Sequence, residues 1–152
     1  GDVEVNGCTI AQFYPFDGRR ATAIGIVPPI LNLKVMNSIV TGYHDDEVVW
    51  TSPKNDEICN FSFDHCVLRT EKMNTEDSLK FTNIVYENLK DTIQFGEKHF
   101  RLFDTDNLKY DFRLRKESAA IGVADAVSSL PTDRRGVLRD DKPDAGCYEF
   151  DE

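Results

Sequence analysis

The pattern that decides the fold first appears as Val5-Asn6-Gly7-Cys8-Thr9-Ile10. Similar apolar-turn-apolar stretches return at residues 35–40 and 63–68 and, more loosely, at 81–86. A unit of this size cannot bury its apolar face alone, so its repetition predicts stacked coils that share one core. We expect an all-β fold, a right-handed parallel β-helix of about three to four coils with an irregular C-terminal cap.

Each repeat contains one place where the alternation of inward and outward side chains skips a residue, which requires a turn. The residue at this turn is Gly7, Asn37, His65 or Asn83 in successive repeats. Gly, Asn and His tolerate positive φ better than most residues. We therefore predict a left-handed backbone conformation at all four turns.

The same register assigns the inward positions of each coil. They are Val3, Val5, Cys8 and Ile10 in the first coil, Leu33, Val35, Ser38 and Val40 in the second, and Phe61, Phe63, Cys66 and Leu68 in the third. Cys8 and Cys66 would lie two coils apart, roughly 9.6 Å, which is beyond the reach of a disulfide. Any disulfide would involve Cys59 or Cys147, and the pattern does not decide between the oxidised and reduced states.

Residues 21–27 and 47–50 are β-rich and predict a third strand in the first two coils. Residues 75–90 fit either a capped amphipathic helix or a strand, and we favour a strand over 79–86 because it continues the motif. On this basis residues 1–90 form the coils, and residues 91–152 form a C-terminal strand and capping tail of the same domain. The first coil has no visible cap, which predicts further coils upstream or self-association through that edge.

Composition narrows the classes of partner. The 152 residues are 40% hydrophobic and carry a net charge of −9, which argues against a nucleic-acid backbone as the main partner and against membrane insertion. Neutral glycans, cations and proteins remain as partner classes.

Three elements near the C-terminus form a recognisable signature. They are Tyr110-Asp111-Phe112-Arg113-Leu114, Ser118-Ala119-Ala120-Ile121-Gly122 and Lys142-Pro143-Asp144-Ala145-Gly146-Cys147-Tyr148-Glu149-Phe150. Together they resemble the C-terminal end of bacterial right-handed parallel β-helix proteins of the pectate-lyase-like superfamily, which reads D-Y-R-L, S-P-A-I-D and P-D-x-G-A-Y-E. Such proteins are common exported proteins of Bacteroidetes-type bacteria.

The chain departs from that signature at four positions: Phe112 in the aromatic place, Ala119 for proline, Gly122 for aspartate and Cys147 for alanine. The resemblance implies the β-helix fold, a location outside the cell or at the cell surface (the outer membrane or periplasm of a Gram-negative bacterium) and an association with polysaccharides. It does not imply catalysis.

A tail of this kind also has a physical purpose, because the open end of a stack exposes strand edges and core side chains. We predict that the tail caps this end. Gly146 would allow a close approach of backbones, and Tyr148 and Phe150 would anchor the last strand.

The loop at residues 12–20 joins the aromatic residues Phe13, Tyr14 and Phe16 to Arg19 and Arg20. Aromatic faces stack on sugar rings and arginine binds carboxylates in bidentate fashion, so this loop is the first candidate for a glycan-binding patch. The alternative is that the aromatic side chains only pack the loop onto the coil beneath.

A second candidate patch contains Tyr43, His44 and Trp50. We predict that these residues contribute to glycan binding, and the histidine could also serve as a general base or bind a metal. The alternative is a solvated turn.

The adjacent acidic residues Asp45, Asp46 and Glu47 are candidates for a calcium site. Neighbouring residues of an extended chain point to opposite sides, so such a site would need ligands from other coils. Residues 104–107 resemble a calcium loop but lack its glycine and distal glutamate, so a turn is the better interpretation. We predict no other metal site and no cofactor.

We assign no catalytic residue, because no nucleophile-base-acid set or phosphate loop is visible in the sequence. The favoured function is a non-catalytic C-terminal segment of an exported protein that presents loops to a polysaccharide or a surface protein. The rival is a polysaccharide lyase or glycoside hydrolase acting on an acidic glycan, with its catalytic coils upstream. A third alternative is a segment that serves only as a cap and assembly surface.

Overall fold

Strands make up nearly all of the regular secondary structure in the described residues, which confirms the predicted all-β class. The structure is a computed structural model that describes residues 1–16 and 21–152. Within those residues the only helical segments are two short 3₁₀ turns, η1 (Glu76–Lys80) and η2 (Gly96–His99).

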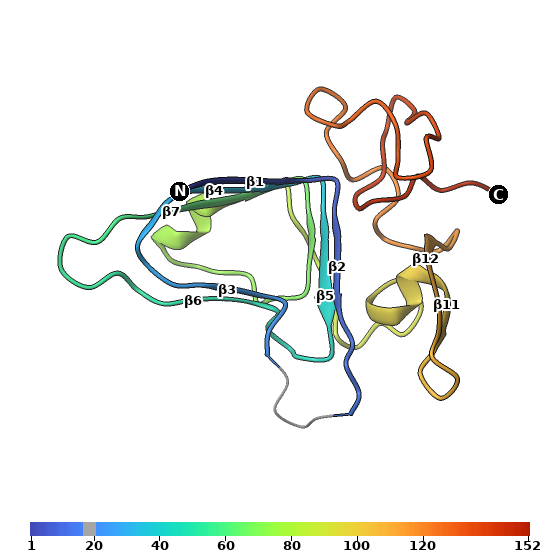
Figure 1. The fold of residues 1–152 in the computed structure, drawn as a ribbon, viewed down its shortest axis with the longest axis horizontal. Coiled ribbons are helices and arrows are strands. Elements are labelled where there is room, and N and C mark those ends of the chain that lie inside the picture. The colour runs from blue at the N-terminus through green and yellow to red at the C-terminus, as the bar shows by residue number, and fades with distance from the viewer. Residues whose placement is uncertain (17–20) are drawn as a thin grey trace.

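Three parallel sheets form the first part of the chain and lie along three sides of a common interior (Figure 1). Sheet A contains β1 (Asp2–Asn6), β4 (Ile30–Met36), β7 (Cys59–Asp64) and β9 (Phe81–Thr82). Sheet B contains β2 (Thr9–Gln12), β5 (Ile39–Gly42), β8 (Val67–Leu68) and β10 (Val85–Tyr86). Sheet C contains β3 (Ile24–Ile26) and β6 (Val48–Trp50), the two third strands that the sequence predicts. Neighbouring strands in each sheet come from successive repeats.

The register of the sheets matches the predicted columns. Val5 lies beside Val35, Val35 beside Phe63 and Phe63 beside Phe81. Val35 and Phe63 are fully buried, and the rings of Phe63 and Phe81 stack at 5.2 Å. These columns belong to the core between the sheets, where the apolar burial that stabilises the fold is concentrated.

One inward assignment is wrong. Val3 lies beside Leu33 in sheet A but is 52% exposed. It belongs to the first repeat, whose strand β1 has only β4 as a neighbour among the described strands. Its column therefore ends at the surface.

The predicted left-handed turns are confirmed. The φ angles of Gly7, Asn37, His65 and Asn83 are 62°, 52°, 48° and 52°. Each residue lies between a strand of sheet A and the following strand of sheet B. The corner between the two sheets is therefore the same in all four repeats.

The four cysteines are free thiols in the structure and form no disulfide. Cys8, Cys59, Cys66 and Cys147 are all free. The amide of Cys8 donates to the Ser38 hydroxyl at 3.0 Å, as expected for neighbours in one column. Burial raises the pKa of the Cys66 thiol to about 12, so this thiol remains protonated and unreactive.

The prediction of a strand over residues 79–86 is correct only in part. The helix η1 occupies Glu76–Lys80, and Leu79 is 82% exposed. The chain then adopts the two short strands β9 and β10. Only the part that continues the repeat motif pairs with the previous repeat.

A hairpin follows the parallel sheets. Its strands are β11 (Phe100–Asp104) and β12 (Lys109–Leu114), which pair in antiparallel fashion. The predicted turn at residues 104–107 is confirmed, because the amide of Asn107 donates to the Asp104 carboxylate at 3.0 Å. The sequence predicts β12, whereas β11 was missed.

The C-terminal tail lies against the side of the stack. Ala120 and Ala145 pack on Ile39 and Val67, which point outward from sheet B. Figure 1 shows the hairpin beside β2 and β5, and the tail next to the corner where these strands begin. The prediction of a cap over the end of the stack is therefore wrong in its placement. The predicted last strand is wrong as well, because residues 115–152 form no strand and contain only the isolated bridge between Thr132 and Leu138.

The predicted close approach at Gly146 is confirmed. A Cβ atom added at Gly146 would lie 2.7 Å from the Thr9 Oγ1 atom and 2.9 Å from the Ile39 Cδ1 atom, and φ of Gly146 is +98°. The backbone of the tail therefore lies directly on sheet B. The amide of Gly146 donates to the backbone carbonyl of Asn37 at 2.8 Å.

We predict that Gly146→Ala lowers the free energy of unfolding by about 2–4 kcal/mol, because a clash adds to the cost of positive φ. Urea denaturation measures the change. Gly136→Ala is the matched control, since Gly136 has a φ of +81° with no atom within 4 Å of the added Cβ. It should cost only about 1–2 kcal/mol. Equal losses in the two variants would contradict the close approach.

Candidate functional site

Both candidate loops converge on an aromatic cluster beside the hairpin. The ring of Phe13 lies 5.0 Å from that of Tyr43, 6.5 Å from that of Phe100 and 4.8 Å from that of Phe103, all edge to face. Because Phe13 is only 7% exposed, it anchors the first loop to the second loop and to the hairpin. Its ring face is therefore not free for a sugar, contrary to the prediction.

Tyr14 and Phe16 remain on the surface. They are 53% and 66% exposed, and their rings contact each other at 5.5 Å. They follow directly after the buried anchor Phe13, so they lie near the cluster. Arg19 and Arg20, the predicted cationic part of this patch, lie outside the described residues.

The residues of the second candidate patch lie in two different places, some at the aromatic cluster around Phe13 and one against the core. Tyr43 and His44 are half-buried, and Tyr43 touches Phe13. The ring of Trp50 instead lies 5.5 Å from that of Phe61 and 5.6 Å from that of Phe81, packed against the core. Trp50 is therefore half-buried against the core, and the structure does not bring it to the aromatic cluster around Phe13.

Glu47 is a structural carboxylate. Its side chain is fully buried, and it accepts hydrogen bonds from the amides of Ala23 and His44, both at 2.8 Å. Gly42 leaves the space that the carboxylate fills, since a Cβ atom added there would overlap the Glu47 Oε1 atom. Glu47 therefore fastens the second loop to the segment just before β3 in the preceding repeat, and both of its carboxylate oxygens are engaged by backbone amides.

The other two acidic residues of this loop, Asp45 and Asp46, line a hollow of about 330 Å³ together with Glu71 and Glu87. The Asp46 carboxylate accepts hydrogen bonds from the Thr70 hydroxyl at 2.8 Å and from the Glu71 amide at 3.0 Å. Asp45 is exposed. In the described part of the chain no three histidine, cysteine or acidic residues are placed to hold a metal ion.

The fold brings together a buried network of hydrogen-bonded polar side chains that the sequence did not reveal. His99 is fully buried, with its Nδ1 atom 2.7 Å from the Ser118 hydroxyl and its Nε2 atom 3.1 Å from the Glu87 carboxylate. The other oxygen of Glu87 pairs with Arg69 at 3.0 Å. No short-range pattern could reveal this set, because its members lie on separate segments between residues 69 and 118.

The connectivity of these groups fixes the direction of one hydrogen bond. An ionised Glu87 can only accept, so the His99 Nε2 atom donates to it, and the His99 Nδ1 atom shares the second hydrogen bond with the Ser118 hydroxyl. The Ser118 oxygen in turn accepts from the amide of Ala120 at 3.2 Å. Every group is satisfied, and the Ser118 and His99 side chains are sealed from solvent. Although the set contains a hydroxyl, an imidazole and a carboxylate, its hydroxyl has no open face for a substrate.

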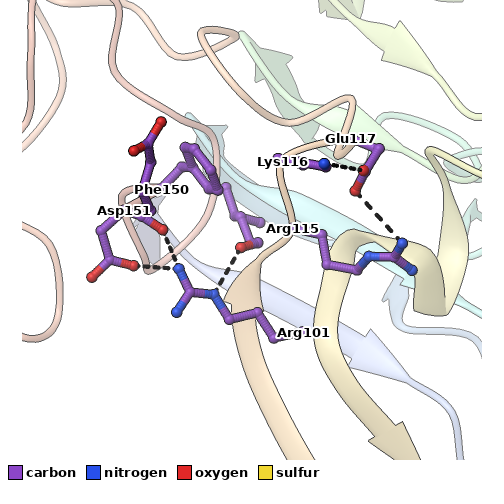
Figure 2. A pocket seen from close by; sticks show the side chains of 8 residues that line it. Arg101, Arg115, Lys116, Glu117, Phe150 and Asp151 are labelled. Atoms are coloured by element: carbon purple, nitrogen blue, oxygen red, sulfur yellow. Dashed lines mark hydrogen bonds and ion pairs between the residues drawn. The ribbon is translucent and has the colours of Figure 1, made fainter.

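A hollow of about 520 Å³ lies between the hairpin and the C-terminus. Figure 2 shows that its charged side chains point toward one another. Arg101 pairs with Asp151 at 2.6 Å, and Glu117 lies 3.5 Å from Arg115 and 3.6 Å from Lys116. Arg101 is therefore paired with a carboxylate of the protein itself, while Arg115 and Lys116 share the single carboxylate of Glu117.

Comparison of the chain with protein-family models, curated proteins and solved structures found no match. None of the helical segments in the described residues is long and apolar enough to cross a membrane.

We predict that Ser118→Ala lowers the free energy of unfolding by about 1–3 kcal/mol, because it leaves the buried Nδ1 atom of His99 without a partner. Chemical denaturation measures the loss. Ser78→Ala, at an exposed position of η1, is the control and should change stability by less than about 0.5 kcal/mol. A Ser118 variant as stable as the control would show that the hydrogen bond to His99 contributes nothing.

The same chain of groups predicts a dependence on pH. Burial raises the pKa of Glu87, but the hydrogen bond and charge of His99, together with Arg69, outweigh burial and hold this pKa below its usual value of 4.5. A carboxyl group with a lowered folded-state pKa stabilises the fold above its unfolded pKa, and this contribution is lost as the pH falls through the folded pKa.

We therefore expect the stability difference between the wild type and Glu87→Gln to be constant near neutral pH and to shrink below about pH 4.5. Denaturation curves collected from pH 7 to pH 3 measure this difference. A difference that stays constant across the range would contradict the lowered pKa of Glu87.

Proposed function

We propose that this chain is the C-terminal part of an exported right-handed parallel β-helix protein. The proposal is supported by three parallel sheets whose neighbouring strands come from successive repeats, and by a corner with the same left-handed residue in each repeat. The hairpin and the tail then form a lateral cover on sheet B. The resemblance of residues 110–150 to the end of such proteins adds the setting, which is the surface or periplasm of a Gram-negative bacterium.

We further propose that the segment binds a polysaccharide, or a surface protein, without turning it over. The observation that carries this proposal is the exposed pair Tyr14 and Phe16, which follows the buried anchor Phe13. Exposed aromatic rings offer flat apolar faces to sugars and to protein side chains. A loop held in place before binding loses less conformational entropy on binding than a free loop.

The chemistry of the buried polar groups favours binding over catalysis. Ser118 and His99 are buried away from solvent. Both oxygens of the Glu47 carboxylate accept hydrogen bonds from backbone amides, those of Ala23 and His44. These groups stabilise the fold and have no face toward a substrate. A lyase or glycoside hydrolase built on this chain would therefore need acid-base residues other than these.

We expect a glycan-array screen of the chain, run with calcium and with chelator, to detect retention of at least one glycan without shortened or unsaturated products. Tyr14→Ala with Phe16→Ala should weaken that retention at least tenfold, since two stacking faces are lost. Leu79→Ala, which truncates another exposed apolar side chain, should leave it unchanged.

Two results would contradict the proposal. Calcium-dependent products would indicate an enzyme. Retention that survives the loss of both Tyr14 and Phe16 would move the binding surface away from this loop.

A further inference from the structure

The last repeat leaves one strand edge of sheet B open. Among the described strands, β10 pairs only with β8. This edge lies inside the chain, because residues 87–152 follow it and none of their strands pairs with β10. The neighbouring strand β9 differs, since η1 precedes it and the amide of Phe81 donates to the carbonyl of Ser78. The open edge at this end of the stack is therefore that of β10.

The backbone groups of Tyr86 face the open edge. The amides of Val85 and Glu87 donate to the carbonyls of Cys66 and Leu68 in the previous repeat, both at 2.9 Å. The backbone groups of successive residues in a strand point to opposite edges. The amide and carbonyl of Tyr86 therefore point away from β8, and they have no partner among the described residues. Unpaired groups of this kind are a template for another strand.

The hollow of about 330 Å³ that contains Asp45 and Asp46 adjoins this edge, because Tyr86 and Leu89 also line it. Tyr86 is half-buried and Leu89 is 48% exposed, so the hollow has an apolar wall. In sheet B, Tyr86 lies beside Leu68, whose side chain belongs to the core. A strand laid along β10 would cover this apolar wall and bring one of its own side chains to the hollow.

The hollow is acidic. Four carboxylates line it, against the single ammonium group of Lys72. Two of them are engaged within the chain: Asp46 accepts from Thr70 and from the amide of Glu71, and Glu87 pairs with Arg69 and His99. The other two, Asp45 and Glu71, are exposed and have no cationic partner among the described residues. The hollow is therefore suited to a cationic group from another molecule.

We propose that the edge of β10 binds an extended basic segment of a partner protein by strand addition, with a lysine or arginine side chain in the hollow beside Asp45 and Glu71. In this mode the main-chain hydrogen bonds hold the added strand, and a pocket beside the edge selects its side chain. The strand β10 is short, at two residues, so the charges at the hollow supply much of the affinity and the selectivity.

A second copy of this chain is a less favourable occupant. Each copy carries a net charge of −9 and the same acidic hollow, so two copies repel each other at this edge. A basic segment gains from the same charges. The site is separate from the loop that carries Tyr14 and Phe16, and this proposal does not depend on glycan binding.

Fluorescence anisotropy with a capped, labelled heptapeptide of alternating valine and lysine tests the proposal. We expect saturable binding that weakens as salt rises. The same peptide with glutamate in place of lysine should bind at least about tenfold more weakly. Asp45→Asn combined with Glu71→Gln should raise the dissociation constant of the lysine peptide by about tenfold, because it removes the two free carboxylates.

Asp106→Asn combined with Asp141→Asn is the matched control. It removes the same charge from exposed positions in the hairpin turn and the tail, and it should change the dissociation constant by less than about twofold. Far-UV circular dichroism reports whether each variant is folded. Equal weakening in the two double variants would overturn the proposal, since it would indicate attraction to the net charge alone.

Two further peptides test the strand pairing on the wild-type chain. One is N-methylated at every valine and the other at every lysine, so each lacks the amide donors along one edge only. One of them should bind about tenfold more weakly than the other. Equal binding of these two peptides would overturn strand addition. So would equal binding of the lysine and glutamate peptides, or association of the chain with itself in place of peptide binding.

Discussion

The left-handed corner between sheets A and B is the constraint on which the rest of the structure depends. Side chains alternate along a strand, so the single residue at the corner decides which residues of both neighbouring strands face the interior. With Asn37 at the corner, Val35 before it and Val40 after it are both buried in the same core. A corner displaced by one residue would turn the apolar positions of one sheet outward.

The same constraint gives sheet B two apolar faces. Val40 and Leu68 point inward, while Ile39 and Val67 point outward, and all four are fully buried. A parallel sheet with both faces covered reads as a continuous apolar run, which is what these strands show. The tail and the hairpin supply the outer cover, so they form a second core and not a lid over the end of the stack. The sealed histidine joins this cover to the sheet, because its partners come from both parts.

The local features of the fold could be predicted from sequence, because period-two alternation and tolerance of positive φ are properties of short segments. The side of the stack on which the tail lies could not, since it depends on contacts between residues more than a hundred positions apart. The same limit applies to the candidate site. Adjacent residues such as Phe13 and Tyr14 look alike in the sequence, but the hairpin covers only Phe13. Trp50 resembles a ligand-binding aromatic in the sequence, but in the fold its ring packs against Phe61 and Phe81 at the side of the core.

The corner also explains why the tail docks beside the second repeat. Of the four corner residues, Asn37 is buried, and its side-chain amide donates to Asn6 at 2.9 Å and to Ser128 at 3.1 Å while its oxygen accepts from the amide of Asp125 at 2.8 Å. Its backbone carbonyl accepts from Gly146. Glycine at the first corner could adopt the same φ but has no side chain to make these bonds. Asn37 therefore adopts the positive φ that the corner requires and also makes the hydrogen bonds that hold the tail. These bonds fix the position of the tail relative to sheets A and B.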